Sequence, residues 1–446
     1  MSAFDFLKWD DVLLRLIEEI EHRSDSWEKI LMSKPAIVLR SWQGKISLCL
    51  PCTRGDFLRV GLSTWSLEFG RSLGLLSSGE DVILCADELV DPEDIWGSPD
   101  LVPLSSNSAL TLKLLDRQDK EGDWLRQIPT STSNSVCPRA VFFGVKGGVG
   151  RSSALTALAI HLANKGKKVL VIDADFESPG ISSSLLGPER PDFGLVDWMT
   201  AHSLGCPEDQ LSEMATDSLV EISPLSQGTN GRILVAPAHS KLTQAYIAKL
   251  GRLYRTTNEG VSFAQRMNKL VTMLEQIHEV NVTLIDSRAG IDDTAAAAVT
   301  QLEARVTFLF AINTAQTWDA YRLLFSHLQR HPSLHTVDDF RPSLRMVSAL
   351  TPEEVGAYKG YWNDFQQKAY DTCMTLYDDD NGSGDPTIFS PAPNDEDSPH
   401  FAARVMWHEV LRAFAPLEEK GQLGRVLMES VFGNFLAGAE ALLGDS

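Results

Sequence analysis

The chain has 446 residues, 43% of them hydrophobic, and a formal net charge of −20. This length is enough for about two or three domains, and the acidic balance disfavours nonspecific DNA binding because no large Lys/Arg cluster stands outside the glycine-rich segment described below. No apolar run of about 18 residues occurs, and the first residues lack the basic and apolar blocks of a secretion signal, so we expect a cytoplasmic protein.

Residues 1–127 are predicted to form a small α/β domain. Residues 9–22 have the spacing of an amphipathic helix, and residues 65–75 are predicted to form a second helix. Strand-like runs are predicted at residues 36–42, 45–50, 57–62, 81–86 and 109–115. No pattern in this domain indicates a particular chemistry.

The six cysteines include one pair with suggestive spacing, Cys49-Leu50-Pro51-Cys52. No second pair and no histidine cluster would complete a metal site, and the pair ends a strand-like run. A structural role is therefore favoured over metal binding.

Residues 128–138 are predicted to be a linker rich in Ser and Thr, which offers little to bury. The second domain is expected to span residues 139–446.

The second domain begins with a short apolar run that leads into a glycine-rich turn, Gly144-Val145-Lys146-Gly147-Gly148-Val149-Gly150-Arg151-Ser152-Ser153. An Ala/Leu-rich segment with helical spacing follows it directly. Such a turn lets backbone N–H groups converge on a polyphosphate, the start of the helix adds partial positive charge, and the Ser152 hydroxyl is placed to reach Mg²⁺.

These residues resemble the deviant Walker A signature of the MinD/ParA family of P-loop ATPases, with KGGVGR in place of KGGVGK. The resemblance implies a doubly wound, mostly parallel α/β sheet that binds ATP and Mg²⁺. Lys146 matches the signature lysine of the family. Arg151 stands where the family has its ordinary P-loop lysine, and a planar guanidinium does not act as the compact point charge that bridges the β- and γ-phosphates. Val145 takes the place of the first Walker glycine, a milder departure.

Two further segments extend the resemblance. Residues 168–173 read as a buried strand that leads into Asp173-Ala174-Asp175, similar to the Asp-x-Asp switch I segment. Residues 282–286 read as a strand ending in Asp286, with Gly290 four positions on, as in Walker B and switch II. Arg288 stands where family members often have proline; it could sense the nucleotide or a partner, or form surface salt bridges.

The resemblance implies roles for individual residues. Lys146 and Asp175 would be catalytic, the first by reaching across a dimer to the partner's phosphates and the second by orienting the attacking water. Mg²⁺ would be held by Ser152, Asp173 and Asp286. The nucleotide would be bound by Gly147, Gly148, Val149, Gly150, Arg151, Ser152, Ser153 and Gly290.

The remainder of the domain is predicted to contain buried strands at residues 233–237, 306–314 and 344–349. Residues 376–399 are acidic and rich in Gly and Pro, and a solvated loop is favoured over a cation site because the spacing is not that of a Ca²⁺ loop. Residues 423–443 have an apolar helical stripe with few basic flanks. We expect this helix to dock on the protein's own core, with a partner groove or a membrane surface as less favoured alternatives.

Two functions from different classes fit the sequence. The first is a slowly hydrolysing ATPase that acts as an ATP-dependent homodimerisation switch and controls a protein partner through residues 1–127. The alternative is a nucleotide-binding scaffold or sensor with little or no hydrolysis, which Arg151 favours and the acidic set Asp173, Asp175 and Asp286 opposes. A bacterial tyrosine kinase on a similar P-loop has little support, because the C-terminal region lacks a tyrosine cluster.

Overall fold

A computed structural model describes most of the chain in two compact units, residues 1–127 with 330–332 and the remainder. The residues that the structure describes are 9–22, 27, 30–31, 34–98, 100–104, 111–117, 122–126, 136–254, 257, 260–352, 355–379, 388–409, 412 and 414–444. Most of the predicted linker, namely residues 128–135, lies outside them.

The first unit contains short helices and five strands. Its elements are α1 (Trp9–Glu21), β1 (Ala36–Arg40), β2 (Ile46–Leu50), α3 (Arg54–Arg59), α4 (Ser63–Leu73), η1 (Gly74–Leu76), β3 (Ile83–Cys85), η2 (Ala86–Glu88), α5 (Pro92–Trp96), β4 (Leu101–Pro103), β5 (Leu112–Asp116) and η3 (Gly122–Leu125).

The strands of the first unit form one mixed sheet in the order β3-β2-β1-β5-β4. β1 pairs antiparallel with β2 through a tight hairpin and parallel with β5, while β2 pairs parallel with β3. The helices bury aromatic rings against one face, where Trp65 meets Trp27 edge-on at 5.2 Å and stacks on Phe69 at 5.3 Å. The small α/β domain predicted for this region is confirmed.

The strand predicted at residues 57–62 is wrong, because these residues begin inside helix α3. Thr53 caps this helix, since its side chain accepts a hydrogen bond from the backbone N–H of Asp56. Phe57 is buried on the inner face of the helix, whereas the adjacent Leu58 is exposed. Burial along this segment therefore follows one helical face rather than the alternation of a strand. Local capping thus outweighed the strand preference of Phe and Val.

The second unit is larger and alternates strands with helices. Its elements are β6 (Arg139–Gly144), α6 (Arg151–Asn164), β7 (Lys168–Ala174), α7 (Ile181–Leu186), α8 (Leu195–Ser203), α9 (Glu208–Asp217), β8 (Glu221–Ile222), η4 (Pro224–Ser226), β9 (Arg232–Ala236), α10 (Tyr246–Leu253), α11 (Phe263–His278), β10 (Val282–Ala289), α12 (Asp293–Ala296), η5 (Ala297–Gln301), β11 (Val306–Ala311), α13 (Ala315–Leu328), η6 (Arg341–Ser343), β12 (Leu344–Thr351), α14 (Val355–Cys373), β13 (Ala403–Met406), η8 (Lys420–Leu423) and α15 (Arg425–Leu443).

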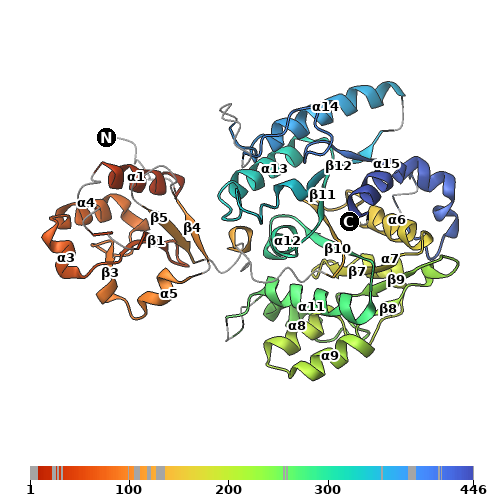
Figure 1. Ribbon diagram of the computed structural model, residues 1–446, viewed down its shortest axis with the longest axis horizontal. Helices are drawn as coiled ribbons and strands as arrows, with labels where there is room; N and C mark the ends of the chain where they lie inside the picture. The colour runs from red at the N-terminus through yellow and green to blue at the C-terminus, as the bar shows by residue number, and fades with distance from the viewer. Residues whose placement is uncertain are drawn as a thin grey trace. The chain divides into compact units, whose positions relative to one another are not determined.

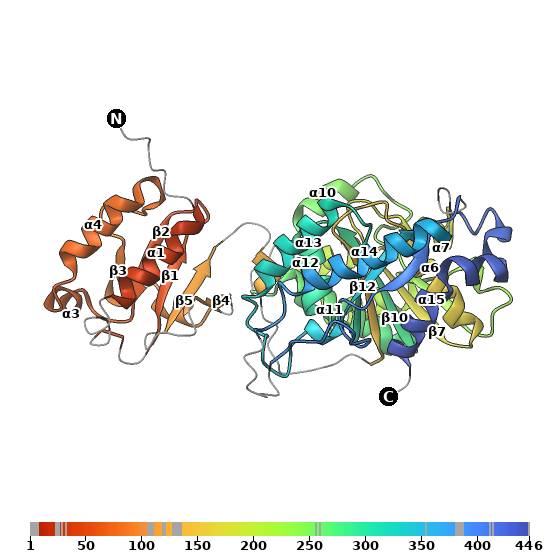
Figure 2. The ribbon, with the colours of Figure 1, turned by 90° about the horizontal axis from the view of Figure 1, so that it is seen from above.

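The sheet of the second unit has eight strands in the order β13-β12-β11-β6-β10-β7-β9-β8. All neighbours pair parallel except β8 and β9. Helices α6, α7 and α15 lie on one side of it, and α11 to α14 lie on the other (Figures 1 and 2). This is the doubly wound, mostly parallel α/β fold that the sequence predicts, and its strand order reverses beside β6.

The two faces of this sheet bury alternate residues of the same strands. Phe142 of β6 faces the cluster formed with α6 and α15, whereas its neighbour Phe143 packs edge-on against Tyr321 of α13 at 6.3 Å. Both phenylalanines are fully buried, as expected for a parallel sheet covered on both sides.

Helix α15 docks on the core of the second unit, as predicted. Among the described helices it is the one long and apolar enough by composition to cross a membrane. Val431 is buried, and the Phe435 ring lies 5.0 Å from Phe308, 6.0 Å from Phe310 and 6.1 Å from Phe142. Its apolar character is therefore explained by packing on β6 and β11.

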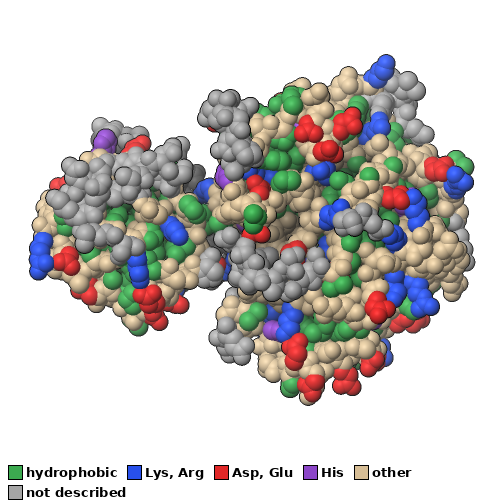
Figure 3. Space-filling view, in the orientation of Figure 1, with side chains coloured by type: hydrophobic (Ala, Val, Ile, Leu, Met, Phe, Trp, Pro, Cys, Tyr) green, Lys and Arg blue, Asp and Glu red, His purple; other side chains and the backbone are tan. Residues whose placement is uncertain are grey.

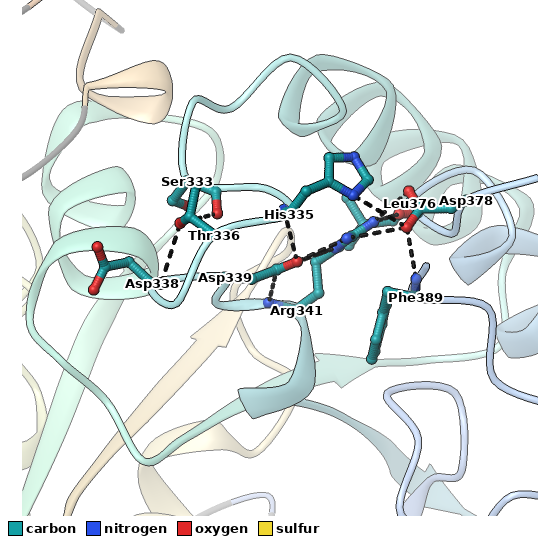
Figure 4. A network of polar contacts seen from close by, with 9 residues as sticks. All are labelled: Ser333, His335, Thr336, Asp338, Asp339, Arg341, Leu376, Asp378 and Phe389. Carbon is teal, nitrogen blue, oxygen red and sulfur yellow. Dashed lines mark hydrogen bonds and ion pairs between the residues drawn. The ribbon is translucent and has the colours of Figure 1, made fainter. Parts of the chain in front are cut away.

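A buried arginine anchors part of the acidic segment predicted to be a solvated loop. Arg341 is fully buried and pairs with Asp339 at 2.7 Å and with Asp378 at 2.8 Å (Figure 4). Its guanidinium also lies 4.9 Å from the centre of the Phe389 ring. The prediction of a solvated loop is therefore wrong at its beginning, where Asp378 ties the segment to η6, just before β12. Residues 380–387 lie outside the described residues.

The docking of α15 predicts the cost of removing its central ring. Phe435→Ala should lower the free energy of unfolding by about 3–5 kcal/mol, because it leaves a cavity among three phenylalanines. Urea unfolding followed by far-ultraviolet circular dichroism measures this change. Val426→Ala, on an exposed position of the same helix, is the matched control and should change stability by less than about 0.5 kcal/mol. Equal effects of the two substitutions would contradict the docked position.

Candidate functional site

The glycine-rich turn joins the end of β6 to the start of α6. Gly148 and Gly150 have φ of 73° and 80°, the left-handed region that a side chain disfavours. A Cβ built at either glycine would meet open space, so the backbone conformation rather than crowding requires glycine there. Within the described part of the chain, the backbone N–H groups of Gly147 to Ser152 donate to no protein acceptor. The turn thus presents a set of unpaired donors at the positive end of a 14-residue helix.

Arg151 points from the first turn of α6 into a pair of carboxylates. Its Nε donates to Asp286 Oδ1 at 2.8 Å and its NH2 group donates to Asp175 Oδ2 at 3.0 Å. All three side chains are largely buried. Burial by itself would lower the pKa of Arg151, but Asp286 and then Asp175 outweigh it and raise the pKa. The guanidinium is therefore a fixed positive charge that holds the ends of two strands together.

Ser152 and Asp286 offer oxygen ligands for a divalent cation. Ser152 Oγ donates to Asp286 Oδ2 at 2.8 Å, so the hydroxyl and the carboxylate already lie side by side behind the glycine-rich turn. Oxygen donors of this kind suit Mg²⁺, which commonly takes only one or two protein ligands beside phosphate and water. Within the described residues no group of three or more His, Cys, Asp or Glu side chains forms a metal cluster. The residues present fit a nucleotide-borne Mg²⁺ better than an all-protein cage.

Asp173 lies next to Asp286, because the two residues are direct partners on the parallel strands β7 and β10. Its Oδ2 accepts hydrogen bonds from the hydroxyl and the backbone N–H of Ser182, at the start of α7. Its Oδ1 is buried and has no hydrogen-bond partner among the described residues. Burial, reinforced by the charge of Asp286, raises the pKa of Asp173 to about 7.

Asp175 is the second carboxylate bound by Arg151. Burial raises its pKa to about 6, although the charge of Arg151 works in the opposite direction. One oxygen is bonded to the guanidinium, and the other, Oδ1, is buried without a partner among the described residues. An acid of this pKa lies close to neutrality, in the range that suits a group that orients or activates water.

Lys146 and Gly290 contact neither Arg151 nor the carboxylates bound to it. Lys146 is half-buried, and its Nζ donates to Gln316 Oε1 of α13 at 3.4 Å. Gly290 has φ of 102°, and its N–H donates to the carbonyl of Gly144 at 3.0 Å, so in this conformation that donor is already used.

Arg288 forms surface salt bridges, which is one of the two roles that the sequence allowed for it. It pairs with Glu177 at 3.1 Å and with Asp292 at 3.4 Å. The Tyr254 hydroxyl also donates to Glu177. Because Glu177 follows Asp175 and Arg288 follows Asp286, these contacts link the loop after β7 to the end of β10.

Residues 140–331 match the family model of the CobQ/CobB/MinD/ParA nucleotide binding domain. Residues 140–331 therefore form a nucleotide binding domain of this family. No curated protein matched the sequence.

Several solved structures resemble this chain at low sequence identity. A complex of Cyanothece McdA with ATP is 14% identical and covers 70% of this chain and 98% of its own, with a TM-score of 0.41. A ParA family ATPase from Chlorobium tepidum is 11% identical and covers 67% and 98%, with a TM-score of 0.42. The MinD cell division protein of Aquifex aeolicus is 16% identical and covers 70% and 98%, with a TM-score of 0.38.

Sequence reasoning missed several residues that contact predicted residues of the nucleotide binding domain. Ser182 holds Asp173, Glu177 pairs with Arg288, and Gln316 accepts from Lys146. Glu177 could have been suspected from its place just beyond Asp173-Ala174-Asp175. Nothing in the sequence pattern identifies Ser182 or Gln316, since each contact depends on how the chain folds.

The raised pKa of Asp173 predicts how stability depends on pH. Unfolded Asp has a pKa of about 4, so between about pH 4 and 7 the folded protein binds a proton that the unfolded chain has lost. The proton bound to Asp173 stabilises the folded protein. Its contribution to the free energy of unfolding is complete below about pH 4 and is lost as the pH rises through 7. Asp173→Asn stays neutral, so its free energy of unfolding relative to wild type should increase by about 1–3 kcal/mol between pH 5 and pH 8.

Urea unfolding at both pH values, without nucleotide or Mg²⁺, measures this difference. Glu213→Gln, at an exposed position of α9, is the control and should show the same offset from wild type at both. An offset for Asp173→Asn that does not change with pH would show that Asp173 is ionised in the folded protein.

Proposed function

We propose that this protein binds ATP with Mg²⁺ at the turn before α6, uses the bound nucleotide to form a homodimer, and hydrolyses ATP slowly. The observation that carries the proposal is the buried contact of Arg151 with Asp286 and Asp175, directly behind the unpaired N–H groups of the turn.

The turn supplies the phosphate site. N–H groups from Gly147 to Ser152 would donate to phosphate oxygens, and the partial positive charge at the start of α6 would stabilise the anion. The open space around Gly147, Gly148 and Gly150 leaves room for phosphates close to the backbone. Ser152 and Asp286 would hold Mg²⁺, which neutralises phosphate charge when the nucleotide is bound.

Arg151 would couple phosphate binding to the release of Asp175. The guanidinium now satisfies its charge on two carboxylates, and phosphate oxygens are acceptors that it binds equally well in a two-pronged manner. When a polyphosphate occupies the turn, Arg151 can transfer its hydrogen bonds to the phosphates. Asp175 would then be available to position a water molecule.

The same contact explains why hydrolysis would be slow. While Oδ2 of Asp175 is bonded to Arg151, the guanidinium charge lowers the pKa of the carboxylate and makes it a weaker acceptor for the proton of water. A guanidinium is also broader than an ammonium group, so it does not occupy the position between two phosphate groups that a lysine can occupy. Turnover would therefore depend on how completely Arg151 leaves Asp175.

Lys146 would act across the dimer. Its side chain lies apart from the carboxylate cluster and makes one long hydrogen bond, to Gln316 at 3.4 Å. Little free energy is needed to move a half-buried lysine from such a contact. In the dimer it would contribute positive charge to the phosphates bound by the partner.

The second candidate is a nucleotide-binding scaffold or sensor without meaningful hydrolysis. The double ion pair of Arg151 favours it, because Asp175 would stay bonded if the nucleotide did not displace the guanidinium. The near-neutral pKa of Asp175 favours hydrolysis, since a protein that only binds nucleotide has no need of such a group.

The first unit would bind a protein partner, since no nucleotide motif falls within it. DNA is disfavoured as a ligand by the net charge of −20. On the face in Figure 3, the described basic side chains are interspersed with acidic ones. Membrane binding is disfavoured because the apolar face of α15 is occupied by the core.

The proposal predicts that Arg151→Lys hydrolyses ATP about tenfold faster than wild type or more, because a lysine can bridge the phosphates and leaves Asp175 unblocked. Phosphate release with Mg²⁺-ATP in excess measures the rate. Asp175→Asn in the Arg151→Lys background removes the carboxylate that orients water and should abolish the gain.

Binding of a fluorescent ATP analogue separates the two candidate functions. If wild type binds the analogue but wild type, Asp175→Asn and Arg151→Lys release phosphate equally slowly, the scaffold function is correct. Loss of nucleotide binding on substitution of Ser152 by Ala, with wild-type binding in Glu213→Gln, would place the nucleotide at the turn. Equal binding by both variants would contradict this location.

A further inference from the structure

Cys52 and Cys85 of the first unit lie side by side, although they are 33 residues apart in the sequence. Cys52 follows strand β2, and Cys85 is the last residue of strand β3. The two strands pair parallel, with Leu50 opposite Cys85. The backbone N–H of Ala86 donates to the carbonyl of Cys52 at 3.0 Å, which fixes the two chain segments together just beyond the strands.

Cys49 and Cys52 are close in the sequence, but Cys49 lies on the other face of the sheet. Side chains alternate along β2, and Cys49 is buried with Ile37, Ile95 and Leu115. Cys52 instead packs against the larger cluster that contains Cys85. The fold therefore separates Cys49 from Cys52 and brings Cys52 to Cys85.

The two paired thiols differ in acidity and exposure. Cys52 is half-buried, and the neighbouring thiol of Cys85 lowers its pKa more than burial and the nearby carboxylates of Asp56 and Asp87 raise it. Cys85 is fully buried, and the neighbouring Cys52 together with burial raises its pKa. Cys52 is thus the more accessible and the more acidic of the two thiols, and Cys85 is its buried neighbour.

Three of the other four thiols are buried, and the fourth, Cys206, lies beside Gln210. Burial raises the pKa of Cys49 to about 12, of Cys137 to about 11 and of Cys373 to about 12, so these groups remain unreactive thiols. Metal binding is a weaker explanation of the pair, since the described residues contain no cluster of three or more His, Cys, Asp or Glu ligands.

An arginine holds the two loops in place around the pair. The Arg54 guanidinium binds Glu88 at 2.7 Å and Asp81 at 2.9 Å, and it donates to the carbonyl of Ile83. Glu88 in turn accepts from the backbone N–H of Cys85 at 2.8 Å. These contacts connect the loop after β2 to the end of β3, so both cysteines are fixed at positions set by the same network.

We propose that Cys52 and Cys85 form a reversible redox site that a hydroperoxide converts to a disulfide. The Cys52 thiolate attacks the terminal oxygen of the peroxide, the O–O bond breaks, and Cys52 becomes a sulfenic acid as hydroxide or alkoxide leaves. The Cys85 sulfur then attacks the Cys52 sulfur and forms the S–S bond. The thiol proton and the sulfenic hydroxyl leave as water, and a dithiol reductant restores both thiols by exchange.

Peptide mapping of the full chain tests this proposal. Reduced protein is exposed briefly to hydrogen peroxide, its remaining thiols are alkylated, and trypsin digestion is followed by mass spectrometry without reduction. Cys52 and Cys49 lie on the tryptic peptide 46–54, and Cys85 lies on the peptide 72–113. Wild type should give these two peptides joined, and prior treatment with a dithiol should remove the product.

Three variants locate the bond. Cys52→Ser should abolish the joined peptide, whereas Cys49→Ser, on the same peptide, should keep the wild-type yield. Cys85→Ser should leave Cys52 as a sulfenic acid that dimedone captures, with circular dichroism as the check on folding. A wild-type protein in which both peptides stay separate, or a joined peptide that Cys49→Ser removes and Cys52→Ser keeps, would overturn the proposal. The readout does not involve nucleotide, so its failure is independent of the proposed function.

Discussion

The buried ion pairs of Arg151 with Asp286 and Asp175 are the interaction on which the candidate site depends. A guanidinium removed from water is costly unless its charge and donors are satisfied, and here both carboxylates are needed to do so. The three residues come from the start of α6, the interior of β10 and the loop after β7. Anything that draws Arg151 toward a phosphate must therefore change the contacts of both acidic segments together.

The sheet explains why these groups meet. β6, β10 and β7 are adjacent and parallel, so their carboxyl ends lie at one edge, and Asp173 and Asp286 fall opposite each other in the ladder. This proximity, with burial, is what raises the pKa of Asp173. Helix α15 packs on β6 through Phe435. A helix that is apolar enough to cross a membrane is therefore part of the hydrophobic core.

The sequence predicts the features that depend on local chemistry. The glycine turn, the apolar strands before Asp173 and Asp286, and the doubly wound fold could be predicted because each has a short-range pattern. The prediction failed at residues 57–62, where capping by Thr53 produces a helix. Contacts such as Ser182 with Asp173, or Cys52 with Cys85, could not be predicted, since they join segments whose meeting depends on the completed fold. The structure gathers Arg151, Ser152, Asp173, Asp175 and Asp286, but it leaves Lys146 and Gly290 with other partners.

The central claim is that nucleotide binding switches the protein between monomer and homodimer. Light scattering at fixed protein concentration, with Mg²⁺-ATP and then with Mg²⁺-ADP, tests it most directly, with Lys146→Ala as the variant that lacks the charge proposed to cross the interface. The account predicts a dimer for wild type in ATP, a monomer in ADP, and a monomer for Lys146→Ala in both. An unchanged mass for wild type with ATP demonstrably bound would contradict the switch.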